Sequence, residues 1–394
     1  MASWSGRRCC ACWTGSIHPS AIEGRGWPTG RLLHGSTVDR QGLRGHPHHE
    51  QRIAKSQMTT ILTSKHVAET YRKAIEARPW FQPPWRIRHL DEMAHAPAAE
   101  LDDIRIAFLS SDVLGGSTVD RHDPAMALFC EVLRRAGNLA WLQVPSSGVD
   151  RPIYQELARR GVVLTTATGA AGETVALTAL TGLLALSRRL PLWVQGKHDH
   201  AWLNLRSGDP EPRELRGEKV LIVGAGQIGT HLARMCKGLG MRTHGLRRQV
   251  TACADPYDEM GTIQDLEAAV GTADWVVATC PLTAQTRGIF NASLFARFQP
   301  HASFINVARG GVANEGDLID ALRQGRIEAA YLDVFEVEPL PKDSPLWDLP
   351  NVLLSPHSAG DTRGRHARIA EIFLSNLDRW IEDRPLLNRA DIAG

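Results

Sequence analysis

The sequence lacks two features of exported and membrane proteins: an apolar run that would span a bilayer, and an apolar signal segment near residue 1. Its longest apolar segment, 175–186, is interrupted by threonines, whereas a membrane-spanning helix needs about 20 apolar residues. The seven cysteines form no regular framework, which excludes a disulfide scaffold and is typical of a reducing cytosol. A net charge of +2 predicts no attraction to nucleic acid or anionic membrane. We therefore expect a cytoplasmic globular protein, and the 43% apolar and 22% charged residues agree.

Residues 1–57 differ in composition from the rest, with eight Lys/Arg against three Asp/Glu and no helical or strand periodicity. We interpret them as a disordered extension, or as a segment translated upstream of a true start at Met58. An arginine-rich targeting presequence is an alternative. A metal site at Cys9, Cys10 and Cys12 with His18 is less favoured, because no second paired cluster follows at a finger-like spacing, and we assign no metal site.

From residue 58 onward, short apolar runs alternate with amphipathic segments, which predicts a parallel α/β domain. We expect strands at Thr59–Thr63, Arg86–Leu90, Ile104–Leu109, Leu139–Val144 and Val162–Thr165, and helices at Lys65–Ala77, Pro124–Ala136 and Ile153–Arg160. The segment Ser110–Asp123 is expected to be a loop.

A glycine-rich motif follows the apolar strand that begins at Lys219, and a helix is expected from Thr230 to Leu239. In a strand–turn–helix setting, Gly224 makes the tight turn, Gly226 admits a pyrophosphate and Gly229 lets helix and strand pack closely. An ordinary glycine-rich turn is the alternative. The setting favours a dinucleotide site.

The rest of the chain predicts a doubly wound nucleotide domain of six strands. Beyond the glycine-motif strand, the expected strands are Arg242–Leu246, Trp275–Ala278, Ala302–Asn306, Ala329–Leu332 and Val352–Leu354, with helices at Glu173–Arg189, Leu266–Val270, Glu315–Gln324 and Arg365–Glu382. Pro191 is expected to stop the first of these helices. We expect two Rossmann-like domains: a discontinuous substrate domain, 58–168 plus 360–394, and a dinucleotide domain, 169–359.

Three charged residues follow strands of the second sheet: Arg309, Glu338 and His357. Each alone has an ordinary explanation as a surface turn residue, a solvated acid or a satisfied core histidine. Together they supply a cation for a carboxylate, an imidazole for proton transfer and an acid that holds the imidazole. Ligands of open α/β sheets bind where these residues are expected, beyond the carboxyl ends of the strands.

The motifs, in order, resemble those of the D-isomer-specific 2-hydroxyacid dehydrogenase family over nearly all of 59–390. The matching segments are Val223-Gly224-Ala225-Gly226-Gln227-Ile228-Gly229, Cys280-Pro281-Leu282-Thr283, Thr286-Arg287-Gly288, Asn306-Val307-Ala308-Arg309-Gly310-Gly311, Leu332-Asp333-Val334-Phe335, Glu338-Pro339-Leu340 and Ser355-Pro356-His357. The first 57 residues match nothing in the family.

The resemblance implies a role for each site residue. Arg309 clamps the substrate carboxylate, Glu338 is the partner of the histidine, and His357 is the acid/base. It further implies that Asp333 contacts the nicotinamide carboxamide, and that the turn containing Ser147 and Gly148 offers backbone N–H groups to the substrate carboxylate. Further cofactor-binding residues implied by the resemblance are Gln227, Ile228, Cys280, Pro281, Val307 and Ala308. Glu336 competes with Glu338, but the family places the working acid immediately before a proline.

The strand after the glycine motif bears on the choice of dinucleotide. Arg247 lies where NAD-dependent members of the family usually have aspartate, and Arg248 follows it. Loss of the acid removes recognition of the ribose 2′-hydroxyl, and two guanidinium groups attract a 2′-phosphate. We expect NADP(H), with NAD(H) as the alternative if both arginines are only solvated loop residues.

The sequence thus predicts an oxidoreductase that interconverts a small 2-oxo acid and its D-2-hydroxy acid, similar to a glyoxylate/hydroxypyruvate reductase. Alternatives are phosphite or formate oxidation on the same scaffold, and a dinucleotide-sensing protein like the C-terminal-binding co-repressors. Glu338 argues against formate oxidation, because formate dehydrogenases of this group carry an amide there. A homodimer is expected, with the helix Glu173–Arg189 and an extension carrying Trp193 and Trp202 as its arm.

Overall fold

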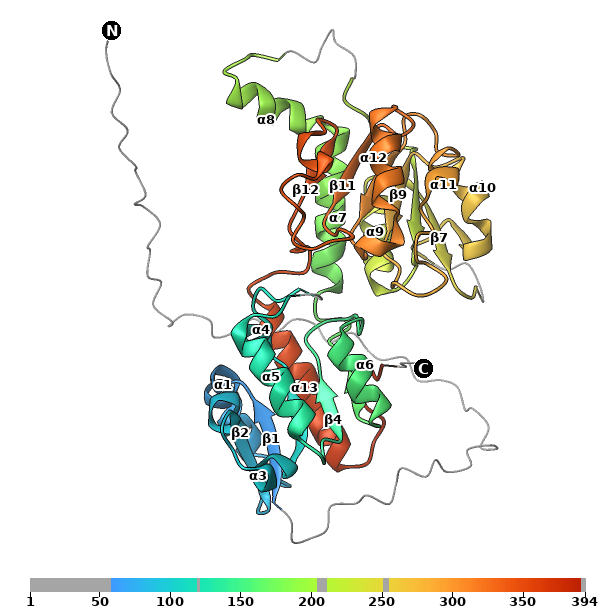
Figure 1. Ribbon diagram of the computed structural model, residues 1–394. Coiled ribbons are helices and arrows are strands. Elements are labelled where there is room, and N and C mark those ends of the chain that lie inside the picture. Colours follow the sequence, from blue (N-terminus) through green and yellow to red (C-terminus); the bar gives the residue numbers. More distant parts are fainter. Residues whose placement is uncertain (1–57, 119–120, 204–210, 251–254, 391–394) are drawn as a thin grey trace, which may run out of the picture. The chain divides into compact units, whose positions relative to one another are not determined.

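The computed structural model describes residues 58–118, 121–203, 211–250 and 255–390. Within these residues the strands form two sheets, and each strand pairing between named strands is parallel (Figure 1). Helices pack against both sheets, so the expected α/β class with two Rossmann-like sheets is confirmed. The interpretations of residues 1–57 lie outside the described residues.

The smaller sheet has the strand order β2-β1-β3-β4-β5. Its strands are β1 (Thr59–Thr63), β2 (Trp85–His89), β3 (Ile104–Phe108), β4 (Trp141–Gln143) and β5 (Val163–Thr165). The accompanying helices are α1 (Lys65–Glu76), α2 (Leu90–Met93), α3 (Ala98–Asp102), α4 (Ser111–Leu114), α5 (Pro124–Arg135) and α6 (Pro152–Arg159). In α5 the apolar residues recur at helical spacing, and this face is buried against the sheet.

The C-terminal helix α13 (Arg365–Ile381) packs on this smaller sheet, although it lies more than 180 residues from the last of its strands. The ring of Phe373 stacks on Phe108 of β3 at 4.4 Å and on Trp141 of β4 at 5.5 Å. Aromatic pairs of this kind add about 0.5–1.5 kcal/mol to their burial. This packing supports the proposal of a discontinuous substrate domain, 58–168 plus 360–394.

The larger sheet has the strand order β12-β11-β10-β9-β6-β7-β8. Its strands are β6 (Lys219–Val223), β7 (Arg242–Arg247), β8 (Glu259–Thr262), β9 (Trp275–Ala278), β10 (Ser303–Asn306), β11 (Ala329–Leu332) and β12 (Val352–Leu354). The other elements are helices α7 (Gly172–Ser187), α8 (Leu190–His198), α9 (Gln227–Gly238), α10 (Leu266–Val270), α11 (Ala292–Phe295) and α12 (Glu315–Arg323), and the 3-10 turns η2 (Ile263–Asp265), η3 (Gly310–Val312) and η4 (Pro345–Asp348).

The chain order of the strands reverses between β6 and β9, and ligands of open α/β sheets bind at such a switch point. Helix α7 packs beside α9 on one face of the sheet, where its apolar residues join the core (Figure 1).

Three sequence-based expectations about secondary structure were wrong. The larger sheet has seven strands rather than six, because the edge strand β8 pairs with β7; the sequence of β8, Glu-Met-Gly-Thr, lacks the apolar run that marks a central strand. The expected loop after β3 contains the short helix α4. The helix that was expected to stop before Pro191 does end, at Ser187, but no further helix was expected there; Pro191 lies in the first turn of that helix, α8, where a proline needs no N–H partner.

The break between α7 and α8 occurs at Arg189, whose φ of 58° is left-handed. Within the described residues no single helix is both long and apolar enough to cross a membrane; α7 and α8 reach that length and composition only together, bent by 69°.

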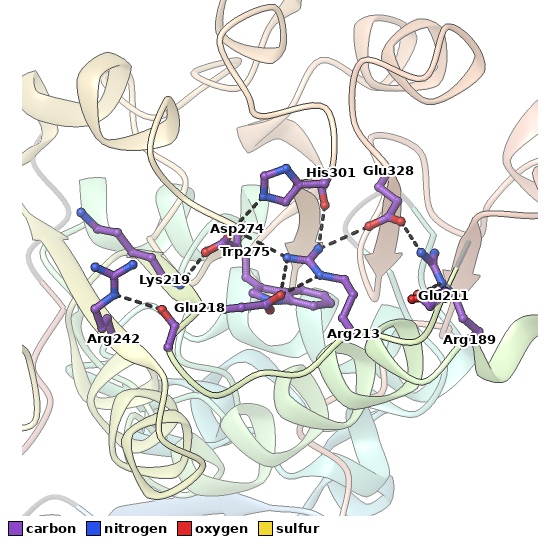
Figure 2. A network of polar contacts seen from close by, with 11 residues as sticks. Arg189, Glu211, Arg213, Glu218, Lys219, Arg242, Asp274, Trp275, His301 and Glu328 are labelled. Atoms are coloured by element: carbon purple, nitrogen blue, oxygen red, sulfur yellow. Dashed lines mark hydrogen bonds and ion pairs between the residues drawn. The ribbon is translucent and has the colours of Figure 1, made fainter. Parts of the chain in front are cut away.

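The amino edge of the larger sheet carries a network of ion pairs centred on Arg213 (Figure 2). Its guanidinium lies 4.5 Å from the ring centroid of Trp275 and pairs with Glu218 at 3.0 Å and Glu328 at 3.3 Å. Glu328 also bonds Arg189, so the segment after α7 is fixed to the start of β11. The Arg213 side chain is only 11% exposed. Because Glu218 and Glu328 directly precede β6 and β11, the network lies at the edge opposite the carboxyl ends of the strands.

Candidate active site

The glycine loop between β6 and α9 is built as a tight turn that only glycine permits. Gly224 has a φ of 113°, and a Cβ there would lie 2.5 Å from the backbone nitrogen of Cys280. Its N–H and that of Ala225 both donate to the carbonyl of Leu246, which fixes the loop to the end of β7. A Cβ on Gly229 would lie 2.6 Å from the Gly224 carbonyl, so strand and helix pack as closely as the motif predicts.

The loop fits the pyrophosphate of a dinucleotide. Gly226 is the N-cap of α9 and has no atoms within 4 Å of a built Cβ, so the space beside its backbone is open. No side chain of the described residues caps this helix, whose first turn contains Gln227, Ile228 and Gly229. The N-terminal N–H groups of a 12-residue helix thus face open space, which is the arrangement that binds a phosphate.

The other residues implied in cofactor binding follow β9 and β10, on either side of the switch point. Cys280 is buried, and burial raises the pKa of its thiol to about 11, so it stays protonated at neutral pH. Pro281 is exposed beside it. Val307 and Ala308 are both 6% exposed and follow β10 directly.

Arg309 is positioned by its own loop. Asn306, a residue that sequence reasoning quoted only as part of a motif, donates from its amide to the Arg309 carbonyl at 3.1 Å and accepts from the Ala308 N–H. The guanidinium donates from Nη1 to the Ala308 carbonyl at 2.7 Å. Gly310 must be glycine, because a Cβ there would overlap the backbone carbonyl of Phe335.

The turn after β4 approaches the Arg309 guanidinium. Nε of Arg309 lies 3.4 Å from Oδ2 of Asp150, and the two side chains are 28% and 35% exposed. A Cβ on Gly148 would overlap the Nη2 atom of Arg309 and lie 2.7 Å from Asp150. Ser147 precedes Gly148 in this turn. The sequence did not predict this role for Asp150, because the residue belongs to no recognisable motif.

His357 and Glu338 form a direct pair, with Nδ1 of His357 2.7 Å from Oε2 of Glu338. Burial by itself raises the pKa of the Glu338 carboxyl, but its hydrogen bond and charge interaction with His357 outweigh burial and hold that pKa below its ordinary value. Glu336, the competing acid, instead accepts from the Glu315 N–H. The structure therefore brings Glu338, and not Glu336, to the histidine.

The Asp333 carboxylate organises the backbone around the histidine. It accepts from Ser355 Oγ at 2.5 Å and from the N–H groups of Ser358 and Ala359. Its own carbonyl accepts from the His357 N–H at 2.8 Å. Burial raises the pKa of this carboxyl, and the hydrogen bonds oppose the shift only in part. Sequence reasoning gave Ser355 no role, although it stands in the same motif as His357.

Arg247 is the last residue of β7, and Arg248 follows it; both side chains are exposed. They stand at the carboxyl end of the strand next to the glycine-loop strand. Two cations are thus available where the fingerprint places the adenosine ribose. The fold, together with the residues at the carboxyl ends of the larger sheet, defines the class of protein: a nicotinamide-dinucleotide-dependent oxidoreductase.

Comparison with known proteins gives the family. Residues 180–359 match the model of the D-isomer specific 2-hydroxyacid dehydrogenase, NAD binding domain. The chain is 34% identical to glyoxylate/hydroxypyruvate reductase B of Escherichia fergusonii, over 69% of this chain and 82% of that protein. It is 27% identical over 66% of its length to the longer D-3-phosphoglycerate dehydrogenase of Archaeoglobus fulgidus, of which it spans 49%.

Solved structures agree with this family. A D-isomer specific 2-hydroxyacid dehydrogenase family protein from Aeromonas salmonicida is 31% identical, with a TM-score of 0.69 over 86% of this chain and 100% of that chain. An NADPH-dependent glyoxylate/hydroxypyruvate reductase from Sinorhizobium meliloti, in complex with NADP and sulfate, is 27% identical, with a TM-score of 0.63 over 84% and 98%. The chain belongs to the D-isomer-specific 2-hydroxyacid dehydrogenase family.

Proposed function

We propose that this enzyme reduces a small 2-oxo acid to its D-2-hydroxy acid, as a glyoxylate/hydroxypyruvate reductase, and that it prefers NADP(H). The observation that carries the proposal is the His357–Glu338 contact of 2.7 Å, with Arg309 also close enough to lower the pKa of the Glu338 carboxyl. The names of the relatives from Escherichia fergusonii and Sinorhizobium meliloti support the substrate class.

Each residue of the set has one task in this proposal. Arg309 binds the substrate carboxylate, and the N–H groups of the turn at Ser147 and Gly148 bind it from the other side. The bound nicotinamide supplies the hydride. His357 donates a proton to the developing alkoxide, and Glu338 balances the positive charge of the imidazolium before the transfer. Asp333 keeps the backbone of His357 in place and orients the carboxamide of the cofactor.

The cofactor preference rests on Arg247 and Arg248. Both are exposed and available at the carboxyl end of β7, and neither position offers a carboxylate for a ribose 2′-hydroxyl. The NADP complex of the Sinorhizobium meliloti relative supports the same preference.

We further propose a homodimer whose arm includes α8. Trp193 is 44% exposed, Val194 60% and Trp202 97%, and exposed apolar groups of this size mark interaction surfaces. Sedimentation at micromolar concentration tests this, and a monomer there would contradict it.

The decisive experiment measures kcat/KM with NADPH and with NADH against glyoxylate, hydroxypyruvate, pyruvate and 2-oxoglutarate. We expect turnover of glyoxylate or hydroxypyruvate, with NADPH as the better cofactor. Tight NADPH binding without turnover of any of the acids would favour a dinucleotide sensor. Preferential oxidation of phosphite would show another activity on the same scaffold.

A further inference from the structure

Two loops leave the carboxyl edge of the smaller sheet side by side. One follows β3 and is described from residue 110 to residue 118, and the other follows β4 and contains Ser147 and Gly148. Because β3 and β4 are paired, the loops start next to each other. Under the proposed function, on which this inference rests, the second loop receives the substrate carboxylate and the first faces the remainder of the substrate.

Arg151 joins the two loops. It follows Asp150 in the chain, and its guanidinium donates from Nη2 to the carbonyl of Ser117 at 2.6 Å and from Nη1 to that of Thr118. Two adjacent nitrogens on two successive carbonyls fix the plane of the group. Asp150 and Arg151 thus reach in two directions, one to Arg309 and the other to the loop after β3.

Within the described residues, each loop also has hydrogen bonds of its own. In the loop after β3, Asp123 accepts from the Gly116 N–H at 2.8 Å, and its own N–H donates to Ser117 Oγ at 2.9 Å. In the loop after β4, Ser146 Oγ donates to the Gly148 carbonyl at 2.6 Å. The hydrogen bonds from Arg151 to Ser117 and Thr118 therefore set how the two loops lie relative to each other.

We propose that Arg151 is a positioning residue that holds the loop after β3 against the carboxylate-binding turn, and so determines affinity and selectivity for the 2-oxo acid. It acts through Ser117 and Thr118 and through its place next to Asp150, without touching the substrate. Misplacing a substrate-positioning group by about 1 Å costs up to about 10²-fold in rate.

The test compares Arg151→Gln with Arg160→Gln. Arg160 provides a matched control, because its guanidinium also donates to carbonyls of the same part of the chain, those of Leu133, Arg134 and Ala136 at the end of α5. We expect Arg151→Gln to raise the KM for glyoxylate roughly tenfold or more and to change the ratio of kcat/KM between glyoxylate and hydroxypyruvate. The KM for NADPH should stay within about twofold.

Arg151→Lys should recover only part of the loss, since one ammonium replaces a fork that spans two carbonyls. If Arg151→Gln and Arg160→Gln alter the KM for glyoxylate equally, the inference is wrong and Arg151 serves stability alone. A wild-type enzyme that turns over none of the 2-oxo acids would instead overturn the proposed function, which separates the two failures.

Discussion

Nδ1 of His357 lies 2.7 Å from Oε2 of Glu338, and the backbone of His357 is left-handed, with a φ of 51°. The first contact places a carboxylate directly on the imidazole ring. The backbone conformation, fixed by the bond from the His357 N–H to the Asp333 carbonyl, aims the ring at the acid. The histidine is thus held from the backbone and from the side chain.

Glu338→Gln should lower kcat/KM for reduction by roughly 10–10³-fold, because an amide cannot balance the charge of the imidazolium. Glu336→Gln is the matched control, since Glu336 contacts the Glu315 N–H rather than the histidine. Equal losses in the two variants would remove Glu338 from the proposed set. His357→Asn is the suitable variant of the histidine, because asparagine tolerates the left-handed conformation.

Gly148→Ala should impair substrate binding without unfolding the protein. The atoms nearest to the added Cβ belong to the ends of the Arg309 and Asp150 side chains, which can move away. We expect the KM for the 2-oxo acid to rise by roughly 10–10²-fold as the guanidinium is displaced, with the melting temperature within a few degrees of wild type. Gly310→Ala offers the contrast: its Cβ would overlap the backbone of Phe335, and unfolding is expected. An unchanged KM in Gly148→Ala would argue against the carboxylate-binding turn.

Arg247→Asp should reverse the cofactor preference. It removes a charge-assisted contact of about 1.5–3 kcal/mol to the 2′-phosphate and adds repulsion, while offering a carboxylate to the ribose of NAD(H). The ratio of kcat/KM for NADPH over NADH should fall on the order of 10²-fold. Arg242→Asp makes the same charge change at the amino end of β7, where Arg242 contacts the Gly217 carbonyl. A ratio that moves equally in both variants would show only a general charge effect.

The sequence predicted the positions of most strands along the chain, because each strand of a parallel sheet is a short apolar run between breakers. It failed where that signal is absent. β8 is an edge strand without an apolar run, and the missed helix α8 has Pro191, which was expected to stop a helix, in its first turn. The return of α13 to the smaller sheet was expected, but its stacking of Phe373 on Phe108 and Trp141 depends on tertiary packing.

For the site, the sequence predicted residues whose chemistry is rare at strand ends, but not those that act through common hydrogen bonds. Arg309, Glu338 and His357 carry charge beside glycine and proline, which makes them visible in a motif. Asn306 and Ser355 bond locally to backbone or carboxylate, and polar residues with such contacts occur throughout any chain. Their importance follows only from what they touch.

Arg213→Ala should destabilise the fold by about 3 kcal/mol, because the carboxylates of Glu218 and Glu328, only 19% and 20% exposed, would lose the cation that they share, while Glu328 keeps its contact with Arg189 (Figure 2). Urea unfolding measures this. Lys237→Met is the control: its ammonium is 42% exposed and pairs with Asp258, so a loss below about 1 kcal/mol is expected. The KM for NADPH should not change in Arg213→Ala, since the network lies at the edge opposite the glycine loop. A shifted KM would contradict that separation.

We expect Asp333 to make a contribution to the free energy of unfolding that falls as pH rises. Burial raises the pKa of its carboxyl in the folded protein, so between the unfolded value, about 3.9, and the raised folded value, the native state binds more protons than the unfolded state. The free energy of unfolding contributed by this group therefore decreases through that window and is constant above it.

In Asp333→Asn this dependence on pH disappears. We expect the difference in unfolding free energy, wild type minus variant, to decline as pH rises through the window, measured by urea unfolding at several pH values. Asp343→Asn, at an exposed carboxyl, should show no such decline. A difference that increases with pH would mean that hydrogen bonds from Ser355, Ser358 and Ala359 outweigh burial and lower the pKa of Asp333.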